Sequence, residues 1–590
     1  MCGIHAAISR TGFQAPKEDL KRFLCNRGPD HTGDQLARID AQDGTSYWIT
    51  LMSTVLALRG GHVTAQPFLD ASSGSALCWN GEAWKIGPDP VIGNDGQAVF
   101  NLLIQASSSQ LLAADSVTAV LKVLQSICGP FAFVFLDRKH NHMFFGRDRL
   151  GRRSLVLKND VDLGVFELSS ISGDEGLWVE VEADAIYQLS YNGSSSKYED
   201  LAEDLITVIA PICKHPWAAA ESSVPALSLG VFNMAIPTEK HALDGQTDTV
   251  EHLRRHLSES LNLRVQCIPA PPIYDHNPHV RMAVLFSGGL DCTVLARMAH
   301  DLLPADQHID LINVAFENPR VFQAAKNAAE PKKTSRNDPK VDEQDTTASS
   351  IDLSPFEICP DRKTGRKAFQ ELQTVCPGRV WRFVAVDIPY SETIAHKANV
   401  IGLIAPHNTE MDLSIAYALY FAARGVGIAS SSIDANLLPY ATPARVLLSG
   451  LGADELFGGY TRHATAFNRR GFSGLLDELK LDVDRLGKRN LGRDDRVISH
   501  WGREARFPFL DENLVKWAVE CPIWQKCGFQ SEAFDTKQDP DIEPGKKVLR
   551  LLAYKLGLHS VAMEKKRAIQ FGARTAKMEI GRTKGTTLIS

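Results

Sequence analysis

The chain has 590 residues, 44% of them hydrophobic and 23% charged, which is enough for at least two domains with buried cores. Its formal net charge of −6 argues against a general binder of nucleic acid or membrane surfaces. The sequence shows no apolar run of about 18 residues and no signal peptide. Its eleven scattered cysteines are not typical of a disulfide framework. We therefore expect a reduced, soluble, cytoplasmic protein.

The first part of the chain carries short apolar or alternating runs separated by Gly, Asn and Asp, a pattern that predicts antiparallel sheet. The segment FAFVFLDRKHNHMFFGRD (131–148) indicates a hairpin whose polar turn covers 138–142. Few helical patterns interrupt this part. We expect an α+β domain over residues 2–205, followed by a less regular connector over 206–247.

From residue 248 to residue 590 the pattern changes to strands that alternate with helices. Apolar runs at 281–286, 310–316, 379–388 and 444–450 indicate strands. Asn408 or Thr409 can cap a helix through DLSIAYALYFAAR, which Gly425 would close. This alternation predicts a parallel sheet covered by helices on both faces. The segment 319–366 is strongly polar, and we expect it to be a mobile surface insertion.

The segment VLFSGGLDCTVLA (284–296) predicts a strand, a tight Gly-Gly turn and a helix. Backbone N–H groups at such a helix start, together with Ser287, can hold phosphate oxygens. The segment is not a Walker A loop, because no Gly-Lys-Ser or Gly-Lys-Thr follows the turn. A purely structural turn is the alternative interpretation.

A second strand runs into a glycine-rich loop in VLLSGLGADELFGGYTRH (446–463), which carries Asp454 and Glu455 side by side. Two carboxylates next to a phosphate-binding loop repel each other and the ligand unless a cation lies between them. Mg²⁺ that bridges carboxylate and pyrophosphate oxygens would remove this repulsion. Capping of a helix by Asp454 is the simpler alternative.

With MCGI at the start and NLGRDDRVISHWGREARFPFLDEN (490–513) near the end, these two loops give four motifs in order. In these motifs the chain resembles glutamine-hydrolysing asparagine synthetases, and most of all the relatives called asparagine synthetase domain-containing proteins. The resemblance implies an N-terminal αββα sandwich of the N-terminal nucleophile amidotransferase type. It also implies a C-terminal α/β domain with the parallel sheet of ATP pyrophosphatases (adenine nucleotide alpha hydrolase-like).

By this resemblance, Cys2 is the nucleophile of a glutaminase and becomes the first residue once Met1 is removed. An α-amino group with a pKa of about 7.7–8.0 can help to deprotonate a thiol with a pKa of about 8.5. The Asn80 side chain and the Gly81 N–H would form the oxyanion hole. Residues matching the glutamine-binding positions are Arg59, Glu82 and Asp95.

In the second domain the resemblance implies that ATP activates the side-chain carboxylate of aspartate as an adenylate, which ammonia then attacks to give asparagine, AMP and pyrophosphate. Mg²⁺ would be held by Asp291 and Asp454. Residues matching the ATP and pyrophosphate positions are Leu285, Ser287, Gly288, Gly289, Asp291, Ser449, Gly450, Lys566 and Arg567. The implied small-molecule partners are glutamine and aspartate, and a monomer or a homodimer are both left open.

The chain departs from the family pattern at three positions. Cys292 stands in place of a serine of the phosphate loop, and Leu451 in place of a glutamate that handles the ammonia step and the aspartate amino group. Ala568 has the spacing of a family lysine, so Lys566 or Arg567 would replace it. We therefore keep three hypotheses: asparagine synthesis, an amide ligase for another carboxylic acid, and a non-catalytic binding module.

Overall fold

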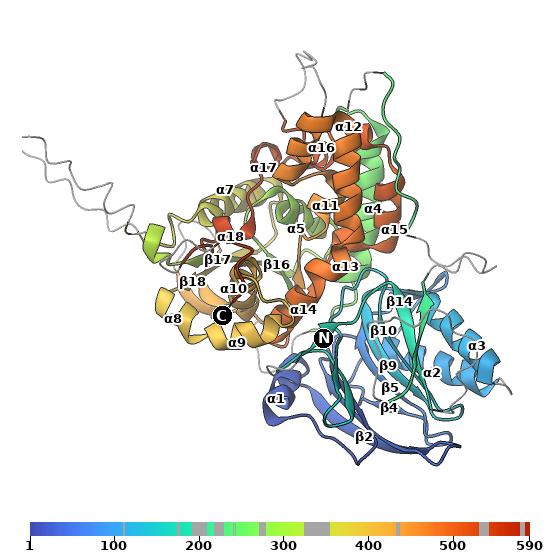
Figure 1. Ribbon diagram of the computed structural model, residues 1–590. Helices are drawn as coiled ribbons and strands as arrows, with labels where there is room; N and C mark the ends of the chain where they lie inside the picture. Colours follow the sequence, from blue (N-terminus) through green and yellow to red (C-terminus); the bar gives the residue numbers. More distant parts are fainter. Residues whose placement is uncertain are drawn as a thin grey trace, which may run out of the picture.

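The computed structural model shows a sheet-rich N-terminal domain beside a larger helical and parallel-sheet domain (Figure 1). It describes residues 1–109, 113–173, 177–191, 209–217, 229–239, 241, 243–270, 279–321, 323, 354–431, 437–529, 542–578 and 584–589. All eleven cysteines of the chain are free thiols. Within the described ranges, no helix combines the length and apolar character needed to cross a membrane.

The N-terminal domain contains two six-stranded sheets. The order of the first sheet is β13 (Val179–Glu180), β11 (Val156–Asp160), β12 (Val165–Ser169), β1 (Gly3–Ser9), β3 (Ser46–Val55) and β2 (His31–Asp40). The order of the second sheet is β15 (Ile212–Pro216), β14 (Ala185–Ser190), β10 (His142–Arg147), β9 (Phe131–Asp137), β5 (Ala76–Gly81) and β4 (Phe68–Leu69). Strands β9 and β10 form the predicted hairpin, with His142 opposite Asp137.

Alternating side chains fix how these sheets pack. Ile8 and Leu51 from the first sheet and Val134 from the second belong to one buried cluster, which fills the space between the sheets. Phe133 and Phe135 point to the opposite face of β9, where they pack with α2 (Asp95–Ser108) and α3 (Ala113–Gln125). On the outer face of the first sheet, α1 (Glu18–Arg27) contacts β1 and β3. Strand β15 lies within the expected connector 206–247, so the second sheet continues beyond residue 205.

The second domain is built on a seven-stranded sheet. The strand order is β20 (Leu438–Ala441), β19 (Val426–Ser430), β18 (Trp381–Ile388), β17 (His308–Phe316), β16 (Val280–Leu285), β21 (Val446–Leu448) and β22 (Glu504–Arg506). The strands from β18 to β22 in this order are parallel, whereas β19 and β20 pair antiparallel at one edge. The expectation of a wholly parallel sheet is therefore wrong at that edge. The sequence pattern did not predict strand β19, because VGIAS is a short run that contains glycine.

Helices cover both faces of this sheet. Asn313 on β17 donates to the Asp361 carbonyl of α7 (Pro360–Val375), whereas Phe316, which points to the opposite face, packs edge-on against Phe421 of α10 (Glu410–Arg424). The N-terminus of α10 is capped by Thr409, which accepts from the Asp412 N–H. Gly425 ends the helix with a φ of 66°. The predicted cap and stop of this helix are thus confirmed.

The expected insertion over 319–366 ends before residue 366, because α7 begins at Pro360. Residues 324–353, for which we expected a mobile insertion, lie outside the described part of the chain. The remaining helices that shape the sites are α4 (Asp248–Val265), α5 (Leu290–Leu302), α12 (Thr461–Asp484), α13 (Leu486–Arg489), α14 (Leu491–Ser499), α16 (Lys547–Lys555) and α18 (Ile569–Gly572).

Candidate active sites

The first candidate site surrounds Cys2, which directly precedes β1. Its cavity has a volume of only about 30 Å³, and Met1 is one of the side chains that line it. Met1 is 2% exposed and Cys2 is 8% exposed. While Met1 is present, it therefore forms part of the wall of the small cavity beside the thiol.

Burial controls the protonation of the two groups at this end of the chain. Burial raises the pKa of the Cys2 thiol, and the neighbouring terminal amine opposes this effect. Burial lowers the pKa of the terminal amine to about 6, although Glu504 acts in the opposite direction. At neutral pH this amine, which belongs to Met1, is therefore mostly uncharged.

Main-chain and side-chain contacts hold Cys2 in place. Arg27 Nε donates to the Cys2 carbonyl at 3.1 Å, and Arg27 Nη2 contacts Asp495 Oδ2 of the second domain at 2.8 Å. Gln66 Nε2 donates to the Cys2 Sγ at 3.7 Å. The following residue, Gly3, donates its N–H to Thr54 Oγ1 at 3.0 Å. The position of the thiol thus depends on both domains.

Asn80 and Gly81 end strand β5. Gly81 lines the Cys2 pocket, and a Cβ at this position would lie 2.5 Å from the Pro130 carbonyl oxygen, so no larger residue fits. Asn80 is fully buried, and neither polar atom of its amide has a hydrogen-bond partner among the described residues. A buried amide without a partner costs stability. Asn80 is not among the residues that line the pocket, although its neighbours Trp79 and Gly81 are.

The three predicted glutamine-binding residues reach the same pocket from three segments. Arg59 Nη1 lies 3.4 Å from Glu82 Oε2. Asp95, in the first turn of α2, accepts from Trp79 Nε1 at 3.0 Å and from the Ala83 N–H at 2.8 Å. Burial raises the pKa of both Asp95 and Glu82, against the lowering effect of nearby arginines. The pocket thus offers one cation and two carboxylates, the set that the two charged groups of an amino acid require.

Two residues of the second domain complete this pocket, and motif reasoning did not assign them a role. Glu504 on β22 lines the cavity. Arg506 on the same strand places Nη2 3.1 Å from Glu82 Oε1. Both belong to the segment EARFPFLD, which the sequence identified only as a family landmark. Nothing in the local sequence shows that this strand edge faces a pocket more than 400 residues earlier in the chain.

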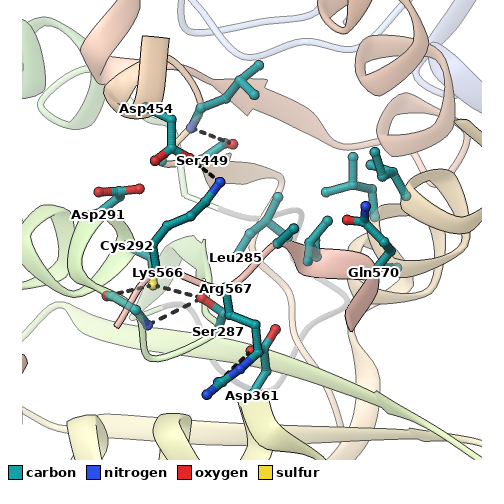
Figure 2. Close-up of a pocket in the computed structure, with 18 of the residues that line it drawn as sticks. Leu285, Ser287, Asp291, Cys292, Asp361, Ser449, Asp454, Lys566, Arg567 and Gln570 are labelled. Carbon is teal, nitrogen blue, oxygen red and sulfur yellow. Dashed lines mark hydrogen bonds and ion pairs between the residues drawn. The ribbon is translucent and has the colours of Figure 1, made fainter. Parts of the chain in front are cut away.

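The second candidate site is a cavity of about 420 Å³ at the carboxyl ends of β16, β17 and β21 (Figure 2). All of its lining residues fall between Leu285 and Ala573, within the second domain. The predicted nucleotide-binding residues that line it are Leu285, Ser287, Gly289, Asp291, Ser449, Gly450, Asp454, Lys566 and Arg567. Gly288 does not line it but makes the turn: its φ is 77°, and a Cβ would meet Gly365 at 2.4 Å.

A lysine that the motifs did not identify lies between the two predicted metal ligands. Lys546 Nζ is 2.8 Å from Asp291 Oδ1 and 2.9 Å from Asp454 Oδ1. Burial opposes ionisation of Asp454, but Lys546 and Lys566 outweigh it and lower the pKa of that carboxyl. Burial raises the pKa of Asp291 despite Lys546. Lys546 thus bridges the two carboxylates.

The two basic residues proposed to replace the family lysine both reach the cavity. Lys566 extends its Nζ to 3.3 Å from Asp454 Oδ2, and Arg567 Nη1 lies 3.7 Å from Asp361 Oδ1 (Figure 2). Burial raises the pKa of Asp361 to about 7, against the lowering effect of Arg567. Ala568 precedes α18 and carries no charge. The Cys292 Sγ lies 3.6 Å from Ser287 Oγ, where the family has a second hydroxyl.

The same cavity also includes Leu451 and several further arginines, among them Arg485, Arg489 and Arg493. Leu451 is half-buried and packs against the large apolar cluster of the domain. Arg485, which precedes α13, and Arg489, its last residue, are exposed. Arg493 contacts Asp412 at 2.6 Å and Asp494 at 2.8 Å, so those carboxylates are already paired. Among the described residues, no cluster of three or more His, Cys, Asp or Glu side chains is arranged to hold a metal ion.

Comparison with known proteins covers both halves of the chain. Residues 1–213 match the glutamine amidotransferase domain family, and residues 387–476 and 471–585 match the asparagine synthase family. The chain is 34% identical to asparagine synthetase domain-containing protein 1 of Bos taurus, over 98% of this chain and 96% of that protein. The Homo sapiens protein of the same name is 31% identical over 98% and 96%. A putative glutamine-hydrolysing asparagine synthetase of Methanocaldococcus jannaschii is 37% identical over 23% of this chain and 28% of that protein.

Proposed function

The chain belongs to the family of asparagine synthetase domain-containing proteins, with a glutamine amidotransferase domain and an asparagine synthase domain, and we propose that it is a glutamine-hydrolysing, ATP-dependent amide ligase that makes asparagine. The observation that carries this proposal is the convergence of Cys2, Arg59, Glu82 and Asp95 on one pocket. Four segments of the chain bring a nucleophile, a cation and two carboxylates together there.

In the glutaminase half, the Cys2 thiolate attacks the amide carbon of glutamine, and the amide oxygen takes the negative charge. The Asn80 amide and the Gly81 N–H donate to that oxygen. The terminal amine accepts the thiol proton and returns it to the leaving ammonia, and water then hydrolyses the thioester to glutamate. Removal of Met1 is required to free the amine of Cys2, and because Met1 lines the small cavity, its removal would also enlarge the space for glutamine.

In the second pocket, an oxygen of the aspartate side-chain carboxylate attacks the α-phosphorus of ATP and pyrophosphate leaves. Ammonia then attacks the activated carbonyl carbon, loses a proton, and AMP leaves. Ser287, Gly289 and the N-terminus of α5 would hold phosphate oxygens. Lys546 and Lys566 would balance the charge of the departing pyrophosphate.

The carboxylate pair also fits Mg²⁺ that arrives with the nucleotide. Asp291 and Asp454 share one ammonium group at 2.8–2.9 Å, which shows that their oxygens converge on a single cation. Two carboxylates plus phosphate oxygens are a usual ligand set for this ion. When bound, Mg²⁺ would stabilise negative charge on pyrophosphate.

The test follows asparagine and pyrophosphate formation by the full-length protein, freed of Met1, with ATP, aspartate and glutamine. We expect equal amounts of asparagine, pyrophosphate and glutamate, and replacement of glutamine by ammonium should support the reaction in the Cys2→Ala variant. Absence of any amide product from aspartate, while ATP and glutamine are both bound, would refute asparagine synthesis.

A different carboxylic acid is a second candidate for the acceptor. Leu451 cannot balance the α-ammonium group of aspartate, while the exposed Arg485 and Arg489 line the same cavity. This charge distribution favours an acid that carries further negative charge and no free amino group. Exchange of labelled pyrophosphate into ATP, measured with aspartate and with N-acetylaspartate or other dicarboxylates, separates the two candidates. Exchange with aspartate alone would exclude the second.

A further inference from the structure

Arg506 reaches from the second domain into the pocket of the first. The residue is 2% exposed, although its side chain is long and charged. Its Nη2 donates to Glu82 Oε1 at 3.1 Å, and its Nε donates to Glu504 Oε1 at 2.7 Å. The guanidinium group lies 5.0 Å from the ring centroid of Trp84. These contacts leave the guanidinium group little freedom to turn.

Arg506 lowers the pKa of the buried Glu82 carboxyl. Burial raises the pKa of Glu82, and Arg506 is the largest influence in the opposite direction. The other charged groups that face Glu82 are Glu504 and Asp95, which raise its pKa, and Arg59, which lowers it more weakly. Even with Arg506 present, this pKa is raised to about 8. Without Arg506, the two carboxylates would outweigh the single remaining arginine, and the pKa of Glu82 would rise further.

The main chain of Arg506 is anchored at the other site. Arg506 pairs with Leu448 in the parallel ladder between β22 and β21. Its carbonyl accepts from the Ser449 N–H at 2.9 Å, and Ser449 lines the nucleotide cavity. Because these contacts are made by the backbone, a substitution of the side chain leaves them in place. The backbone hydrogen bonds of β22 therefore hold Arg506 in place, and its guanidinium group extends to Glu82.

We propose that Arg506 is a positioning residue for glutamine, which holds the Glu82 carboxylate in place for the α-ammonium group of the substrate. The glutamine pocket is thus completed by a strand of the synthetase domain, whose neighbouring residue lines the nucleotide cavity. This inference rests on the proposed glutaminase activity. It assigns a role in glutamine binding to the EARFPFLD segment, although this segment belongs to the second domain.

The experiment measures glutamine hydrolysis by the full-length protein, freed of Met1, from pH 6.5 to 9. Arg506→Met should raise the KM for glutamine about tenfold or more at pH 7 with little change in kcat, because binding and not chemistry is affected. In the wild-type protein the KM should fall as the pH rises through about 8 and Glu82 loses its proton, and in Arg506→Met this fall should move to higher pH. Arg506→Lys should restore part of the affinity, because it restores the charge without the paired contacts.

The matched control is Arg496→Met, which removes another buried arginine that joins the domains, through Glu180 at 2.8 Å, outside the Cys2 pocket. A KM for Arg506→Met equal to that of the wild type, or a rise without pH dependence that the control shares, would overturn the inference. Glu82→Gln provides a second measurement, since its raised KM should not recover at high pH. A wild-type protein without glutaminase activity would instead refute the proposed function itself.

Discussion

The two pockets differ in how far each depends on the other domain. The Cys2 pocket is lined by residues 1–96 together with Glu504, and Arg506 contacts its Glu82. The nucleotide cavity takes all its lining from Leu285 to Ala573. The first pocket is therefore composite and the second is self-contained. We infer that substitutions in β22 weaken glutamine binding, whereas substitutions in the first pocket leave nucleotide binding unchanged.

The pockets also balance charge differently. Around Cys2, buried carboxylates keep raised pKa values and are partly balanced by Arg59 and Arg506. In the nucleotide cavity, Lys546 joins Asp291 to Asp454 directly. A substrate with one positive and one negative group suits the first arrangement. A polyanion that brings its own cation suits the second, and the following predictions test this contrast.

The largest expected effect is at the nucleophile. Cys2→Ala should lower glutamine-dependent amide formation by at least about a thousandfold, because no other group replaces the attacking sulfur. Ammonium-dependent formation should remain near the wild-type rate, since the second pocket contains no residue of the first domain. Parallel assays with the two nitrogen sources measure this. Cys25→Ser, at a half-buried thiol outside the pocket, is the control, and glutamine-dependent product from Cys2→Ala would contradict the mechanism.

The next effect is at Lys546. Lys546→Met leaves Asp291 and Asp454 close together without their shared ammonium, so the exchange of pyrophosphate into ATP should fall about a hundredfold. The KM for glutamine should not change, because Lys546 has no contact with the first pocket. Lys547→Met, at the adjacent half-buried position, is the matched control. An equal loss in both variants would show that helix α16, rather than the ion pair, is responsible.

A smaller effect is expected at Leu451. Leu451→Glu restores a carboxylate to the cavity and should raise the kcat/KM for aspartate-dependent pyrophosphate exchange about tenfold, because the α-ammonium group gains a partner. Leu451→Gln provides the same shape without the charge and should not raise it. If aspartate exchange stays unchanged or falls in Leu451→Glu, the leucine does not limit the use of aspartate.

The smallest effect is a change in the pH dependence of stability at Asp361. Burial raises the pKa of this carboxyl to about 7, above the value of about 3.9 for an unfolded chain. Between these values the unfolded chain loses its proton and the folded chain keeps it, so stability falls as pH rises. Asp361→Asn has no such proton, and its Tm relative to wild type should rise by about 2–4 °C from pH 4 to 7. Parallel Tm curves would contradict the raised pKa.

Local patterns predicted the elements where a sharp signal marks each end. Helix α10 begins and ends as Thr409 and Gly425 predicted, and the hairpin of β9 and β10 lies where the sequence indicated. The antiparallel edge formed by β19 and β20 was missed, since short strands with glycine carry little periodicity. The helix start at Pro360 was hidden in a polar stretch because α7 buries side chains such as Arg362 against partners far along the chain.

The resemblance drawn from four motifs is confirmed over nearly the whole chain. Apart from Asn80 and Gly288, the site residues that the motifs named line two cavities, and their roles remain proposals. They did not name Lys546, Glu504 or Arg506. Each of these acts on carboxylates more than 90 residues away or across a domain boundary, and no spacing within a short segment records such a contact.

The sequence by itself determined the family, the two-domain order, the thiol behind Met1 and the glycine turns, because these depend on neighbouring residues and backbone conformation. Only the tertiary structure decided which charges meet. Burial makes an unpaired charge costly, so a buried charged group pairs with an oppositely charged group from any part of the chain that lies close to it. That is why Arg506 of β22 faces Glu82 and Lys546 lies between Asp291 and Asp454.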